Sequence, residues 1–364
     1  MKIIQVIASV FFGDAVGNDA RALCRVISEL GYETGIYTYD IDPRVKDSFV
    51  HKMSKLPKLN DDDIVIFNHC SGTDLCYDLP KLGGRKMMIY HNITPAHFFE
   101  GYNNDTVKSI QKGYEGTKYL HDKIDYVMAV SQYNADDLKA MGYTCPMYIR
   151  PIVIPFDDYT KVPDQDVIKK YSDGYTNILF LGRIVPNKKQ EDVISAFAYY
   201  KKHINPKSRL ILVGSDGGVE KYGKCLRRYA KALELDDVIF TGQTSFKAIL
   251  AYYTLADIFL CMSEHEGFCV PLVESMFFKT PIVAYDSSAI ASTLGGSGVL
   301  LKEKNPVLTS KVIDRIVNDS EFREGIIEKQ VERLSAFSYE AMKENFKRGL
   351  ELFISGEYKN IGNE

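Results

Sequence analysis

Short apolar runs rich in valine, isoleucine and tyrosine recur along the chain, and amphipathic or turn-rich stretches separate most of them. Runs of this kind predict strands of parallel sheets that helices cover on both faces. They fall into two series, which predicts two doubly wound α/β domains. The expected strands are Ile3–Val10, Thr34–Tyr39, Ile64–Asn68, Met87–Tyr90, Tyr126–Val130 and Met147–Ile154 in the first series, and Ile178–Leu181, Leu210–Val213, Val238–Thr241, Ile258–Met262, Pro281–Tyr285 and Val299–Leu301 in the second.

The pattern breaks near Pro155–Gly174, where prolines and charged residues predict an exposed linker. The expected domains are therefore 1–158 and 175–337. A last amphipathic stretch, Tyr339–Ile354, predicts one long helix because its apolar residues recur at helical spacing.

Composition narrows the class of protein. The 364 residues carry a net charge of −3, so no overall basic field exists to hold nucleic acid, and no nucleic-acid partner is expected. No apolar run is long enough to span a membrane, and Ile3–Val10 is expected to be a first strand rather than a signal peptide. Seven cysteines without any C-x-x-C pair argue against a zinc ribbon or a disulfide scaffold and favour the reducing cytoplasm.

The segment Ser263–Glu274 joins a predicted strand to a predicted helix that begins at Pro271, since proline is favoured in the first helical turn. A helix start offers unpaired N–H groups and a positive dipole end, which suit a diphosphate. Glu266 lies before the helix and Glu274 about one turn inside it, so both can face one pocket and accept hydrogen bonds from sugar hydroxyls. The alternative is that they only complement the helix dipole.

A second loop follows the first strand of the second domain. Gly182 ends that strand, and Arg183 and Lys188 follow at the same edge of the sheet. Two cations on one loop could clamp a diphosphate and stabilise the charge that develops as it departs. The alternative is an ordinary exposed turn.

Together these motifs resemble the signature of glycosyltransferase family 4, the retaining sugar-nucleotide transferases with the GT-B fold. The resemblance covers nearly all of the second domain and includes the Gly242 turn and Thr280–Val283. It implies two Rossmann-like domains that face a central cleft. It also implies that the last helix, extended to residues 338–360, crosses back to the first domain.

The resemblance also assigns roles to residues. Glu274 would accept hydrogen bonds from the nucleotide ribose, and Glu266 would face the donor sugar. Arg183 and Lys188 would hold the diphosphate. The other donor-binding positions that it implies are Gly182, Gly242, Gly267 and the amides of Phe268, Cys269 and Val270. Cys269 stands where the family most often has glycine, and its side chain narrows the conformations open to the loop.

In the first domain, the loop Gly13–Asp19 resembles the family's glycine-bearing loop near the diphosphate, which makes Gly17 a donor-binding candidate. Its spacing is unlike the G-x-G-x-x-G of dinucleotide-binding proteins, which disfavours an NAD-dependent enzyme. The helix is expected to begin near Ala20, with Asp19 as its cap.

His91 follows the predicted strand Met87–Tyr90 and resembles the family histidine that lies over the donor sugar, so we expect it to be catalytic along with Glu266, Arg183 and Lys188. A lone histidine could instead serve a structural role. The sets His91 with His97, and His69 and Cys70 with Cys76, lack metal-ligand spacing, and the family resembled uses no metal. Neither a metal nor a cofactor is expected.

The expected function is retaining transfer of a hexose from a nucleoside diphosphate sugar, with GDP-mannose favoured and a UDP-hexose possible, to a glycan or lipid-linked glycan. A lipid-linked acceptor would bring the protein to the inner face of the membrane, although no polybasic segment stands out in the sequence. The alternatives are a sugar-nucleotide epimerase or hydrolase of the same fold, and a non-catalytic sugar-binding partner of another transferase.

Overall fold

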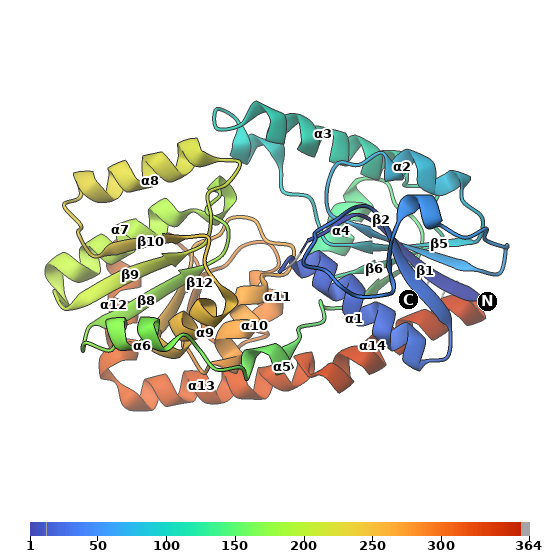
Figure 1. The fold of residues 1–364 in the computed structure, drawn as a ribbon. Coiled ribbons are helices and arrows are strands. Elements are labelled where there is room, and N and C mark those ends of the chain that lie inside the picture. Colours follow the sequence, from blue (N-terminus) through green and yellow to red (C-terminus); the bar gives the residue numbers. More distant parts are fainter. Residues whose placement is uncertain (12, 358–364) are drawn as a thin grey trace. The chain divides into compact units, whose positions relative to one another are not determined.

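The chain forms two compact units, each built on one parallel sheet (Figure 1). The structure, a computed structural model, describes residues 1–11 and 13–357. Unit 1 comprises residues 1–96, 107–155 and 336–357, whereas unit 2 comprises 97–106 and 156–335.

Unit 1 contains a sheet with the strand order β3-β2-β1-β4-β5-β6-β7. Its strands are β1 (Lys2–Val10), β2 (Glu33–Ile41), β3 (Val50–Lys52), β4 (Ile64–His69), β5 (Arg85–Tyr90), β6 (Tyr126–Ala129) and β7 (Met147–Ile149). Its helices are α1 (Ala15–Glu29), α2 (Leu75–Asp78), α3 (Asn104–Tyr119), whose first turn groups with unit 2, α4 (Gln132–Ala140) and α14 (Tyr339–Ser355). Every predicted strand of the first series is confirmed, although β7 is shorter than expected; the short β3 has no apolar run to predict it.

Unit 2 contains a sheet with the order β10-β9-β8-β11-β12-β13. Its strands are β8 (Thr176–Leu181), β9 (Ser208–Val213), β10 (Val238–Gly242), β11 (Ile258–Cys261), β12 (Ile282–Tyr285) and β13 (Val299–Leu301), which confirms the second predicted series. Its helices are α5 (Phe156–Tyr159), α6 (Gln165–Tyr171), α7 (Gln190–His203), α8 (Glu220–Ala232), α9 (Phe246–Leu255), α10 (Val270–Phe277), α11 (Ile290–Leu294), α12 (Pro306–Asn318) and α13 (Ser320–Leu334).

Both sheets reverse the direction of strand addition beside their first strand. In unit 1 the first strand, β1, pairs in parallel with both β2 and β4, and in unit 2 β8 pairs in parallel with both β9 and β11. Such a switch point leaves room for a ligand at the carboxyl ends of the two central strands. The loops after β8 and β11 are therefore the first place to look for a site in unit 2.

The stretch predicted as a linker is largely exposed, as expected, but it is not an irregular connection between the units. Its residues from Phe156 on group with unit 2, where they form α5 and α6. Tyr159 and Tyr171 are buried there, because each helix turns an aromatic side chain toward the unit's core. Residues 97–106 also group with unit 2, which the sequence pattern gave no reason to expect.

The last helix, α14, packs within unit 1. The ring of Phe353 stacks on Tyr126 with ring centroids 5.3 Å apart, and the Arg85 guanidinium lies over the same ring at 4.1 Å. Figure 1 shows α14 beside α1. The predicted helix Tyr339–Ile354 is confirmed, whereas residues 358–360 of the longer range lie outside the described residues. None of the described helices combines the length and apolar character needed to span a membrane.

Helix α1 begins five residues earlier than predicted, and Asp19 is not its cap. Asp14 accepts a hydrogen bond from the Gly17 amide at 2.8 Å and ends the strand-to-helix turn. Asp19 instead lies fully buried in the helix, where it pairs with Arg150 and accepts a 2.8 Å hydrogen bond from the Val153 amide. The pair fixes the segment that follows β7 onto α1.

We predict that Asp19→Ala lowers the free energy of unfolding by about 3–5 kcal/mol, because it leaves the Arg150 charge buried without its partner. Asp136→Ala removes an exposed carboxylate 3.8 Å from Lys139 and should cost less than about 1 kcal/mol. Urea denaturation of both variants tests this. Equal losses in the two variants would contradict the role given to the buried pair.

Candidate active site

Two charged side chains meet at the switch point of unit 2. Lys188, from the loop after β8, places its Nζ 2.6 Å from Oε1 of Glu266, from the loop after β11. Their side chains are only 16% and 10% exposed. Burial alone would lower the pKa of Lys188, but the neighbouring Glu266 carboxylate outweighs it and raises that pKa above its usual range. The lysine is therefore a fixed positive charge at the carboxyl edge of the sheet.

Hydrogen bonds from neighbouring loops hold the backbone of the Glu266 loop in place. The carbonyl of Asn187 accepts from the Glu264 amide at 2.8 Å, and the Asn187 side chain donates to the carbonyl of His265 at 2.9 Å. The Glu266 amide donates to Ser288 Oγ at 2.8 Å. The loops after β8, β11 and β12 thus support one another, so the ion pair rests on a preorganised backbone.

Glycine permits the close approach of the loops after β8 and β9. Gly182 packs under the aliphatic stem of Lys188, whose Cδ and Cε would lie 3.5 Å from a Cβ at that position. A Cβ at Gly214 would meet the Gly182 carbonyl oxygen at 1.9 Å, so only glycine fits there. Gly214 also bridges to Gly242 at the end of β10. The predicted positions Gly182 and Gly242 therefore lie at the same edge of the sheet.

The thiols of Cys261 and Cys269 lie close to Glu266. The hydroxyl of Ser263 donates to Glu266 Oε1 at 2.8 Å and accepts from Cys261 at 3.4 Å. The sulfur atoms of Cys261 and Cys269 and a Glu266 oxygen all lie within 4.8 Å of one another. The polar floor of the site is thus formed by side chains from β11 and from the residue before α10.

Strained backbone gathers in these loops. Lys189, Cys269 and Ser288 adopt left-handed φ angles of 50°, 71° and 46°, in the loops after β8, β11 and β12. Such conformations cost a non-glycine residue about 1–2 kcal/mol, and they persist where surrounding contacts impose them, often at functional sites. For Cys269 this confirms that the loop places a side chain where glycine is favoured.

Helix α10 begins at Val270, one residue before the predicted start, with Pro271 in its first turn. Glu274 lies inside the helix and is buried. Tyr159 donates to its Oε1 and Tyr253 to its Oε2, both at 2.6 Å. Burial raises the pKa of Glu274, and the two phenol hydrogen bonds oppose that rise. Tyr159 was missed by sequence reasoning because it falls in the stretch predicted to be linker.

The remaining predicted residues of unit 2 are less constrained. Arg183 is exposed, and its guanidinium makes no ion pair with a carboxylate of the described chain. Gly267 is half-buried in the loop, and Phe268 is buried with its carbonyl accepting from Thr293 at 2.6 Å. His265, which directly precedes Glu266, is also buried, and this burial lowers its pKa to about 4.

In unit 1, His91 lies at the end of β5, as predicted. Its side chain is buried, and among residues 1–11 and 13–357 neither ring nitrogen has a hydrogen-bond partner. Its Nε2 lies 3.6 Å from Oδ2 of Asp19. Desolvation lowers the pKa of His91 to about 4, so the ring is neutral near pH 7. The Gly17 amide is already held by Asp14, and its role toward a donor stays a prediction.

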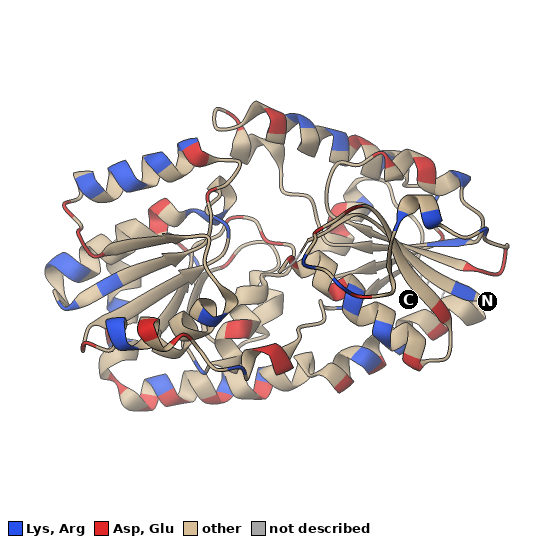
Figure 2. Ribbon diagram, in the orientation of Figure 1, with Lys and Arg blue, Asp and Glu red and all other residues tan. Residues whose placement is uncertain are grey.

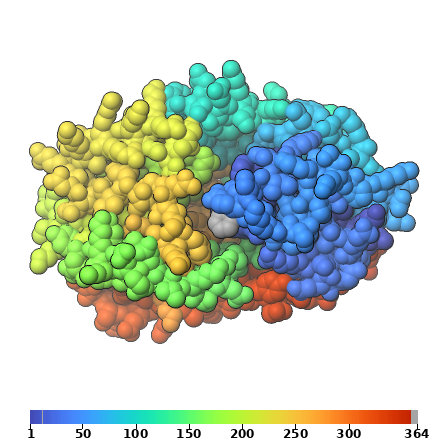
Figure 3. All heavy atoms as spheres, viewed as in Figure 1, coloured from blue at the N-terminus to red at the C-terminus, as the bar shows by residue number. Residues whose placement is uncertain are grey.

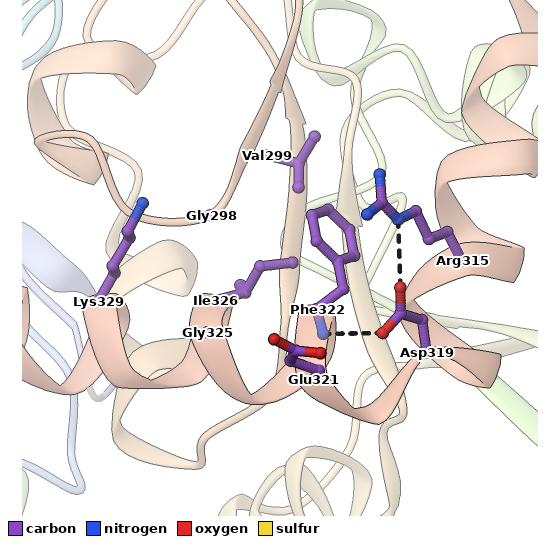
Figure 4. A pocket seen from close by; sticks show the side chains of 9 residues that line it. All are labelled: Gly298, Val299, Arg315, Asp319, Glu321, Phe322, Gly325, Ile326 and Lys329. Carbon is purple, nitrogen blue, oxygen red and sulfur yellow. Dashed lines mark hydrogen bonds and ion pairs between the residues drawn. The ribbon is translucent and has the colours of Figure 1, made fainter.

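A hollow of about 450 Å³ lies elsewhere in unit 2, where helices α12 and α13 approach the start of β13 (Figure 4). Arg315 Nε and Asp319 Oδ2 are 3.4 Å apart on its wall, and Asp319 accepts from the Phe322 amide at 3.0 Å. Gly298 places this hollow at the amino end of the strand, opposite the edge where doubly wound sheets bind ligands. It is separate from the Lys188–Glu266 site.

Residues 163–333 match the family model described as glycosyl transferases group 1, and this stretch contains both motifs and the Lys188–Glu266 pair. It is a group 1 glycosyltransferase domain. The prediction made from the motifs is confirmed for this stretch, and solved structures with the GT-B fold match nearly the whole chain.

Three proteins illustrate the similarity of this glycosyltransferase to others. An uncharacterized glycosyltransferase of Methanocaldococcus jannaschii is 23% identical over 70% of this chain and 65% of its own length. Alpha-monoglucosyldiacylglycerol synthase of Streptococcus pneumoniae is 28% identical over 74% of this chain and 62% of its own. The chain thus spans somewhat less than two thirds of these two relatives. The structure of Anabaena HepE in complex with UDP-glucose has a TM-score of 0.73 and 17% identity, and the match covers 96% of this chain and 99% of HepE.

The low pKa of His91 leads to a prediction about stability in acid. Between the folded pKa of about 4 and the unfolded value of 6.5, the unfolded chain binds more protons, so stability falls as the pH drops through this window. The difference corresponds to about 3 kcal/mol. In His91→Gln this contribution is absent, so its free energy of unfolding should fall less steeply between pH 6.5 and about 4. Parallel curves, measured by chemical denaturation, would contradict the burial of a neutral ring.

Proposed function

We propose that this glycosyltransferase moves a hexose, with retention of anomeric configuration, from a nucleoside diphosphate sugar to a hydroxyl of a glycan or lipid-linked glycan. The observation that carries the proposal is the buried Lys188–Glu266 pair beside the start of α10, at the switch point of the group 1 domain. A fixed cation and a helix start are the groups that a diphosphate requires.

The chemistry follows from that charge. As the bond from the anomeric carbon to the donor phosphate oxygen breaks, negative charge grows on the departing diphosphate. Lys188, the more exposed Arg183 and the α10 start stabilise it, and no metal ion is needed for this. The acceptor oxygen bonds to the anomeric carbon on the face that the diphosphate leaves, and its proton passes to the departing phosphate oxygen. Glu266, held by Lys188, would bind a donor-sugar hydroxyl.

Glu274 would hold the nucleotide ribose. Both its oxygens already accept a phenol hydrogen bond, so its orientation is fixed while each oxygen keeps a second lone pair for a hydroxyl. These contacts do not distinguish one nucleotide base from another. The family resemblance of the loops in the first domain favours a GDP-hexose, whereas the structurally similar HepE was solved with UDP-glucose, so both nucleotides belong in the first binding assay.

We predict that Lys188→Ala and Glu274→Ala each weaken nucleoside diphosphate binding at least about tenfold, since each removes a charged partner of the ligand. Thermal shift with GDP, UDP, GDP-mannose and UDP-glucose measures the loss, because a bound ligand raises apparent stability. Lys207→Ala, at an exposed lysine before the amino end of β9, is the matched control. Unchanged binding in either site variant would contradict the assignment.

Turnover separates the alternatives. With donor and acceptor present, the proposed transferase releases nucleoside diphosphate and forms a product that keeps the donor's anomeric configuration, which NMR reads from the anomeric proton. Donor consumption without any acceptor would instead indicate a hydrolase. Nucleotide binding without turnover would indicate a sugar-binding partner.

A lipid-linked acceptor calls for a membrane-facing surface, and α8 has the properties of one. The sequence showed no obvious polybasic segment because its cations are spaced along a helix. Figure 2 shows α8 banded with basic residues, and in Figure 3 its segment lies on the open surface of unit 2. The exposed cations that share one stripe of this helix are Lys221, Lys224, Arg228 and Lys231.

We predict that replacing Lys224, Arg228 and Lys231 by serine lowers binding to anionic phospholipid vesicles about 100-fold, because each cation contributes about 1 kcal/mol at such a surface. Co-sedimentation measures the change. A control with the same loss of charge replaces three exposed lysines elsewhere in unit 2, Lys302, Lys311 and Lys329. Equal losses in both variants would show that net charge, rather than the α8 stripe, governs binding.

A further inference from the structure

We propose that Cys261, Glu266 and Cys269 form a site for a soft divalent cation such as Zn²⁺, and that the occupied site excludes the donor. The metal site itself stands on the geometry of unit 2 alone. Its effect on donor binding rests on the proposed function.

The geometry brings three ligand atoms together at one point. The two sulfur atoms and a Glu266 oxygen lie within 4.8 Å of one another, and all three residues are buried. With Zn–S bonds of about 2.3 Å and Zn–O bonds of about 2.0–2.2 Å, the ligand atoms of a tetrahedral site lie about 3.5–4 Å apart. The present spacing of at most 4.8 Å exceeds these values by up to about 1 Å, so the three side chains must move closer together to hold an ion.

The ligand atoms determine which metal ions the site can bind. Two thiolates and one carboxylate suit Zn²⁺, Cd²⁺ or Co²⁺, whereas Mg²⁺ and Ca²⁺ require oxygen ligands throughout. Ser263 contacts two of the three ligands, since its hydroxyl hydrogen-bonds Cys261 and Glu266, and such outer contacts orient metal ligands. Binding releases the two thiol protons to solvent. A water molecule can complete the four-coordinate shell.

A bound metal ion would affect donor binding through Lys188. Its ammonium lies 2.6 Å from Glu266 Oε1, so a cation bound to that carboxylate repels Lys188 and takes its partner. Lys188 and Glu266 then cannot keep the arrangement that would hold a sugar diphosphate. Metal and donor should therefore exclude one another, although each can bind alone.

Cobalt titration of the purified full chain tests the metal site, because a thiolate ligand gives Co²⁺ an intense charge-transfer absorption. We expect one Co²⁺ with this band, displaced by Zn²⁺. Cys269→Gly should weaken Co²⁺ binding at least about tenfold and diminish the band. Glycine suits the φ of 71° at this position, so the variant keeps the loop backbone. Cys261→Ala provides an independent removal of one sulfur.

Cys225→Ser, at the exposed cysteine of α8, is the matched control and should bind Co²⁺ as the parent chain does. Absence of the thiolate band in the parent chain, or an unchanged band in both Cys269→Gly and Cys261→Ala, would overturn the metal site. A band lost in Cys225→Ser would place the ion elsewhere and overturn it too.

The exclusion of donor is measured separately, as nucleoside diphosphate affinity with and without Zn²⁺. We expect Zn²⁺ to weaken nucleotide binding at least about tenfold in the parent chain and far less in Cys261→Ala. If Zn²⁺ binds and nucleotide affinity stays the same, the exclusion is wrong. If no nucleotide binds even without metal, the proposed function fails while the cobalt result still decides the metal site.

Discussion

The ion pair between Lys188 and Glu266 is the constraint around which unit 2 is arranged. Two charges held 2.6 Å apart and largely out of water are costly unless further polar contacts satisfy them. Ser263 supplies a hydroxyl to Glu266, and the backbone of its loop is tied to the loops after β8 and β12. Because β8 and β11 are neighbours at the switch point, one pair joins the two loops that border the site.

Holding these loops so close requires unusual backbone. Gly214 must lack a side chain because the Gly182 carbonyl occupies the space, and Lys189, Cys269 and Ser288 accept left-handed conformations. Three left-handed non-glycine residues of unit 2 thus lie at the carboxyl edge of the sheet, and Glu234 and Lys279 adopt the same region before β10 and β12, whereas the central strands β8 and β11 are largely buried. The stability of the core thus supports a locally unfavourable arrangement, which is the usual relation between a rigid scaffold and a site.

The sequence predicted the strands well, together with the two motifs, because apolar runs and strand-end glycines are local signals. It could not predict contacts between residues distant in sequence. Asp19 looked like a helix cap until Arg150, 131 positions away, proved to be its partner. Tyr159 looked like linker because the glutamate it contacts, Glu274, lies 115 positions further on. Both residues are polar groups whose roles depend on a distant partner, and no periodicity records such a pairing.

The two glutamates of the motif, Glu266 and Glu274, lie in different electrostatic surroundings. Glu266 faces a lysine and is kept as part of a charged pair, which suits it to a site where charge develops. Glu274 faces two tyrosines within an aromatic cluster that includes Phe277 and Phe278, and burial there raises its pKa. A carboxylate held by neutral donors suits neutral hydroxyls better than phosphate. The seven residues between them therefore separate two electrostatic environments, one charged and one formed by neutral donors, which is the difference that the proposed roles toward the sugar diphosphate and the ribose require.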